Sequence, residues 1–117
     1  MRIVDHATQA SEEWRPGVMT RMHVSAVMGS VQLCVFQQWC DPGKGAPTHL
    51  HAVEEVLTVL DGQAEIWIED ERATLHQLEK IDRGTVARKE YSECRVGEDA
   101  VLTRCSFTCP RQGYRAA

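Results

Sequence analysis

Residues 43–62 read GKGAPTHLHAVEEVLTVLDG and carry the most specific pattern in this chain of 117 residues. His49 and His51 are separated by one residue, so on a β-strand their imidazoles project from the same face. Glu55 follows four residues later and keeps this parity if the strand continues. Two neutral imidazoles and one carboxylate form a mixed ligand set that suits Fe(II), Mn(II), Ni(II) or Zn(II) rather than Cu(I) or Ca(II). The stretch therefore predicts a site for a divalent transition metal.

The rest of the chain alternates apolar and polar residues with a period of two, interrupted by short turns. Asp61–Gly62 suits a tight type I′ turn, so we expect a hairpin between 56–60 and 64–69. Helix signals reach only one short turn at 11–14. Strands are expected at 18–24, 31–39, 56–60, 64–69, 73–78 and 100–107. The pattern predicts an all-β fold, a single antiparallel jelly-roll β-barrel, because closing the sheet removes exposed edges.

The residues that flank the predicted ligands make the pattern more specific. Five residues separate Gly43 from His49, and six separate Glu55 from Gly62. In this spacing the chain resembles the first motif of the cupin family, with every fixed position matched. The resemblance implies a metal inside the barrel, bound by His49, His51 and Glu55. It also implies a single cupin domain over 1–117, with a core barrel at about 18–108, an N-terminal arm at 1–17 and a C-terminal tail at 109–117.

The second cupin motif, which supplies a third histidine in the family, is not matched. One register places other residue types at its five fixed positions, namely Lys80, Val86, Arg88, Tyr91 and Arg95. Another register places Ala87 at the histidine position. Neither register supplies the missing ligand.

Three interpretations of the metal site follow. In the first, His49, His51 and Glu55 act alone as a facial triad that leaves positions open for substrate or O₂. In the second, Tyr91 replaces the histidine as an oxygen ligand, or as a hydrogen-bond donor to a ligand. In the third, metal binding has been lost, and the pocket binds an organic ligand or nothing.

Two classes of function remain open. The resemblance implies a metal-dependent enzyme acting on a small organic molecule, with isomerase, cyclase or lyase chemistry or as an Fe(II) dioxygenase. The alternative is a non-catalytic protein that binds a small ligand and has a degenerate or empty metal site. The resemblance also implies a homodimer built on edge strands. No residue pattern identifies the substrate.

Composition excludes several other partners. The formal charge is −4, and scattered basic residues argue against binding to nucleic acid. No apolar run is long enough to span a bilayer, and residues 1–14 do not resemble a signal peptide, so we expect a cytoplasmic protein without a membrane partner. The five cysteines are odd in number and include no CxxC pair, so no disulfide framework is expected.

Overall fold

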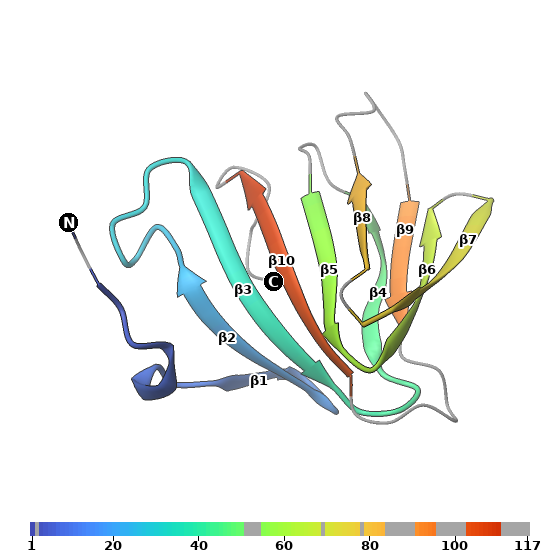
Figure 1. Cartoon of the computed structure of the whole chain (residues 1–117), viewed down its shortest axis with the longest axis horizontal. Coiled ribbons are helices and arrows are strands. Elements are labelled where there is room, and N and C mark those ends of the chain that lie inside the picture. Colours follow the sequence, from blue (N-terminus) through green and yellow to red (C-terminus); the bar gives the residue numbers. More distant parts are fainter. Residues whose placement is uncertain are drawn as a thin grey trace.

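The computed structural model describes residues 1, 3–50, 55–68, 70–77, 79–83, 91–95 and 103–110. Strands in these ranges form two antiparallel sheets (Figure 1). The larger sheet has the order β1 (Glu12–Arg15), β2 (Val18–Val24), β3 (Leu33–Cys40), β10 (Thr103–Pro110), β5 (Glu55–Asp61) and β8 (Lys80–Arg83). The smaller sheet has the order β4 (Gly45–Leu50), β9 (Tyr91–Arg95), β6 (Gln63–Ile68) and β7 (Glu71–His76).

Strands that are far apart in sequence are neighbours in both sheets. β10 lies between β3 and β5, and β9 lies between β4 and β6. In Figure 1 the six-stranded sheet runs from the left to the centre, and the four-stranded sheet closes the right side. This is the connectivity of a jelly roll, so the predicted all-β jelly-roll barrel is confirmed.

The core forms because alternate residues of the strands face inward. On β3 and β5 the buried residues are every second one. Leu57 and Val59 are fully buried, and Phe36 is 3% exposed. The main apolar cluster consists of Cys34, Phe36, Leu57, Val59, Ala64, Ile66, Leu75 and Cys105. Burying a side chain of the size of Leu57 contributes about 1.5–3 kcal/mol to folding.

The hairpin expected at Asp61–Gly62 is not formed. Gly62 does make a turn with a φ of 84°. However, β5 pairs with β10 and β8, while β6 pairs with β7 and β9. Both edges of β5 are therefore already hydrogen-bonded, and the turn instead carries the chain from one sheet to the other.

The N-terminal segment also differs from the expectation. Residues 12–15 form strand β1 rather than a helical turn, and a short 3₁₀ helix, η1 (His6–Thr8), precedes it. β1 pairs with β2, and the Trp14 ring packs 5.4 Å from the Phe36 ring, measured between centroids. Burial of this indole against the core outweighs the weak local helix signal. No helix among the described residues is long and apolar enough to cross a bilayer.

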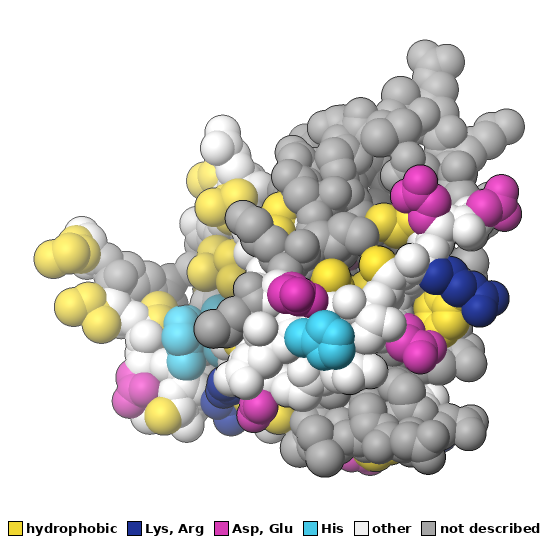
Figure 2. All heavy atoms as spheres, turned by 45° about the vertical axis from the view of Figure 1, so that its right-hand side comes forward, with side chains coloured by type: hydrophobic (Ala, Val, Ile, Leu, Met, Phe, Trp, Pro, Cys, Tyr) yellow, Lys and Arg dark blue, Asp and Glu magenta, His cyan; other side chains and the backbone are white. Residues whose placement is uncertain are grey.

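The outer face of the small sheet is polar. All residues of β7 except Leu75 are exposed. Arg72 lies over the ring of Trp67, with 5.2 Å between the guanidinium carbon and the ring centroid. Figure 2 shows mostly acidic side chains on the visible part of this side, with a basic side chain beside them. These exposed charges are typical of a solvated surface.

Candidate metal centre

The motif residues lie where the chain passes between the two sheets. His49 is near the end of β4 in the four-stranded sheet, and Glu55 is the first residue of β5 in the six-stranded sheet. Gly43, just before β4, has a φ of 74°, and Gly62, just after β5, has a φ of 84°. Both values favour glycine, because L-residues with a Cβ are strained there. The two glycines of the motif therefore supply the turns that bound the predicted ligand strands.

A backbone carbonyl orients the His49 ring. Nδ1 of His49 lies 2.6 Å from the carbonyl oxygen of Pro47. Because a carbonyl oxygen can only accept, Nδ1 must donate, and the neutral ring then has its lone pair on Nε2. A metal-binding histidine usually donates its other ring N–H to a carbonyl or carboxylate in this way. The chemistry of this donor group therefore fits a metal ligand.

Glu55 is a buried carboxylate. Its side chain is 2% exposed, and it shares the inward face of β5 with Leu57 and Val59. A carboxylate at such a place is retained when a cation or hydrogen-bond donors offset its desolvation. The β5–β8 register places Arg83 directly opposite Glu55. The burial of Glu55 is thus compatible with a metal ion as the compensating charge.

The remaining predicted ligands are His51 and Tyr91. His51 lies outside the described residues. In the β4–β9 ladder Tyr91 stands opposite Leu50, and Ser92 stands opposite His49. Since facing residues of a ladder share a face, Tyr91 and His49 occupy positions of opposite parity. Where the structure describes the chain, it brings together no group of three or more His, Cys, Asp or Glu able to hold a metal.

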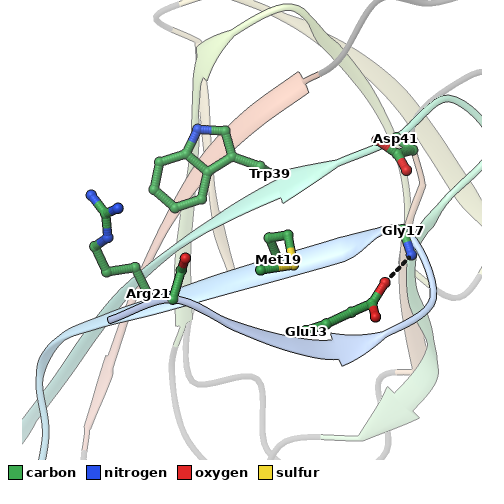
Figure 3. Close-up of a pocket in the computed structure, with 7 residues that line it drawn as sticks. Glu13, Gly17, Met19, Arg21, Trp39 and Asp41 are labelled. Atoms are coloured by element: carbon green, nitrogen blue, oxygen red, sulfur yellow. Dashed lines mark hydrogen bonds between the residues drawn. The ribbon is translucent and has the colours of Figure 1, made fainter. Parts of the chain in front are cut away.

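A cavity of about 370 Å³ lies on the outer face of the six-stranded sheet, and neither His49 nor Glu55 lines it (Figure 3). Its lining residues are Ser11, Glu13, Gly17, Met19, Arg21, Trp39 and Asp41. The Arg21 guanidinium lies 5.2 Å from the centre of the Trp39 ring. The aromatic residues of β3 and β6 lie in different places: Phe36 is in the core, whereas Trp39 lines this outer cavity and Trp67 lies under Arg72. Residue parity along β3, with Phe36 and Gln38 inward, was the signal that could have placed Trp39 outside.

Comparisons with known proteins agree on the fold. A family model described as the cupin domain matches residues 39–77. The polyketide cyclase RemF from Streptomyces resistomycificus is 19% identical and superposes with a TM-score of 0.78, covering 94% of this chain and 79% of that one. KdgF from Halomonas sp. is 13% identical, with a TM-score of 0.76 and 92% of each chain covered. An RmlC-like cupin from Shewanella frigidimarina is 14% identical, with a TM-score of 0.72 and 95% and 91% coverage. No curated protein sequence matches the chain.

At these identities the solved structures establish the fold, and the family model adds the motif segment. The chain thus has the all-β jelly-roll fold of the cupins, and its segment 39–77 matches the cupin domain.

Proposed function

We propose that this protein binds a divalent transition metal through His49, His51 and Glu55 and acts on a small organic molecule held in the barrel. Two observations carry the proposal: the ring of His49 on β4 is oriented by a backbone carbonyl, and the carboxylate of Glu55 on β5 is buried. His51 stands between them in the sequence, at the spacing of the first motif.

The protein side chains have separate tasks in this proposal. The Pro47 carbonyl holds the His49 ring in one orientation and one tautomer. Phe36 and Leu57 belong to the buried core cluster, so the interior of the barrel is apolar beside Glu55. When bound, the metal supplies a Lewis acid for a carbonyl group or, as Fe(II), a site for O₂. The polyketide cyclase RemF shares this fold, which supports a small organic substrate.

Metal analysis tests the proposal directly. The purified protein, loaded with Fe(II), Mn(II), Ni(II) or Zn(II) and then desalted, is expected to retain close to one metal per chain by elemental mass spectrometry. His49→Ala is expected to retain at least about tenfold less, because removing one of three ligands weakens the whole set. His76→Ala is the matched control, since His76 is exposed on β7 and outside the motif.

Stoichiometric metal in a folded His49→Ala protein would contradict the site. Far-ultraviolet circular dichroism and the unfolding midpoint of each variant show whether it is folded. His51→Ala provides a second removal of a ligand if His49→Ala does not fold.

The missing histidine of the second motif favours a second candidate function, a non-catalytic protein that binds a small ligand. β9, the strand paired with β4, contains no histidine. This candidate predicts a stable protein that retains no metal after loading, and in which His51→Ala leaves the affinity for the ligand nearly unchanged.

A further inference from the structure

Two histidines and one glutamine join the N-terminal arm to the barrel. Of the arm expected at 1–17, the part that precedes β1 is residues 3–11, which is called the arm below. It contains η1 (His6–Thr8) and lies on the left of Figure 1 before the chain enters β1. Nδ1 of His6 is 2.7 Å from Oε1 of Gln9, and Nδ1 of His23 is 3.1 Å from the same oxygen. The two imidazole rings are 3.9 Å apart between centroids and tilted by 47°. His23 belongs to β2, so these contacts fasten the arm to the sheet.

The shared acceptor fixes where the protons are. An amide oxygen only accepts, so both histidines donate from Nδ1, and in the neutral rings both lone pairs lie on Nε2. An acid-induced proton must therefore go to Nε2. In His23 this atom is buried and accepts or donates no hydrogen bond among the described residues, and the whole side chain is 5% exposed. The second proton would place a charge where water does not reach.

The surroundings of His23 oppose that charge. Burial is the largest cause and lowers the pKa of His23. A hydrogen-bonding interaction with the Gln37 side chain raises this pKa, and the electrostatic effects of His6 and Arg21 lower it, so that the net shift is downward. The charged and titratable groups acting on His23 are thus His6 from η1 and Arg21 from β2, while β3 contributes only the neutral Gln37. None of them is a carboxylate. Two protonated rings at 3.9 Å would also repel each other.

We propose that His6, Gln9 and His23 form a pH-sensitive latch that holds the N-terminal arm on the barrel at neutral pH and releases it in mild acid. The sign follows from linkage. In the released arm His23 titrates near its ordinary value of about 6.5, whereas in the latched arm its pKa is lower. Latching is therefore independent of pH above about 6.5 and weakens as the pH falls below this value, because only the released state takes up the proton readily.

The latch lies at an irregularity of strand β2. His23 is the extra residue at a register shift in β2, and β-bulges commonly re-aim a side chain. Val24, next to His23, is paired with Val35 on β3. Val35 is paired with Thr108 on β10, and Thr108 is paired with Val56 near the start of β5. The latch and the start of β5 thus lie at the same end of the six-stranded sheet. The contacts of the latch itself involve no motif residue, so the inference stands or falls independently of the metal site.

Backbone NMR relaxation on the full chain tests the latch. The amides of Thr8 and Gln9, which donate to the carbonyls of Asp5 and His6, report on η1. At pH 7.5 their order parameters are expected to be about 0.85, and at pH 5.0 below about 0.6, with the strands unchanged at both pH values. Equal order in the arm at the two pH values would overturn the proposal.

Variants separate the latch from a general effect of acid. Asn places an amide N–H near the position of Nδ1 but does not titrate, so His6→Asn/His23→Asn is expected to keep the arm ordered at pH 5.0. His76→Asn, at an exposed histidine of β7, is expected to behave as the wild type. If the double variant does not fold, Gln9→Glu provides an independent test, since a carboxylate acceptor stabilises protonated histidine and should move release to lower pH. If the arm of either variant is released at the same pH as the arm of the wild type, the proposal is overturned.

Discussion

Ser92 stands directly opposite His49 in the ladder between β4 and β9. Facing residues of an antiparallel pair have Cβ atoms about 4.5–5.5 Å apart and share a face. A ligand at position 92 would thus project beside His49, whereas one at position 91 would have the parity of Leu50. In the proposed site, position 92 is therefore where a fourth protein ligand, a third histidine, would fit.

We expect Ser92→His to strengthen metal binding by about tenfold or more, because a third imidazole completes a closed nitrogen and oxygen set. The dissociation constant for Zn(II) or Ni(II), measured by competition with a chelator, checks this. Tyr91→His is the matched control one residue away and should leave the constant within about threefold of the wild type. A larger gain at position 91 than at 92 would show that Tyr91 has the ligand position.

The apolar core makes its own prediction. Leu57 is fully buried between β10 and β8, so Leu57→Ala should lower the free energy of unfolding by about 2–5 kcal/mol. Leu33→Ala removes the same atoms from a side chain that is 52% exposed and should cost less than about 1 kcal/mol. Urea unfolding followed by tryptophan fluorescence measures both. Similar losses in the two variants would mean that Leu57 is not a core residue.

A buried polar pair spans β2 and β3. Nε2 of Gln38 donates to Oγ1 of Thr20 over 3.1 Å, and the two side chains are 4% and 2% exposed. Thr20→Val removes the acceptor and should cost about 1–3 kcal/mol, because the amide donor is left in an apolar interior. The double variant Thr20→Val/Gln38→Leu should be more stable than the sum of the two single changes predicts. Additive losses across this double-mutant cycle would show that the hydrogen bond contributes no coupling.

Gly17 at the rim of the outer cavity is constrained by its backbone and by its neighbours. Its φ is 77°, and a Cβ there would lie 2.6 Å from Cγ of Lys44 and 3.1 Å from Oδ2 of Asp41. Gly17→Ala should therefore cost about 1–3 kcal/mol of stability. Gly17→Ala/Lys44→Ala removes the closer contact but keeps the positive φ, so it should recover only part of the loss. Complete recovery in a denaturant titration would assign the whole cost to the contact with Lys44.

The quaternary structure can be checked in solution. We expect a homodimer, and β1 is an edge strand of the six-stranded sheet that a second copy could cover. Light scattering at micromolar concentration should give a mass near twice the 13.2 kDa of the chain. A mass of one chain at this concentration would contradict the dimer.

Sequence alone was sufficient for the features that depend on local order. The period-two alternation predicted an all-β barrel, and it also predicts the inward position of Glu55, because parity along a strand is a property of consecutive residues. The motif likewise singled out Gly43 and Gly62, and at both residues the backbone adopts a positive φ. These features need no knowledge of which strands are neighbours.

Only the tertiary structure decided the features that depend on pairing between distant strands. Asp61–Gly62 had the chemistry of a hairpin turn, yet β5 already had β10 and β8 on its two edges, so the turn joins two sheets. Two other contacts likewise join segments that are remote in sequence. Ser92 is paired with His49, and the ring of His6 contacts the ring of His23. Such neighbours are selected by the burial of the whole core and the closure of the barrel, and this global free-energy balance is not encoded in any short stretch of the chain.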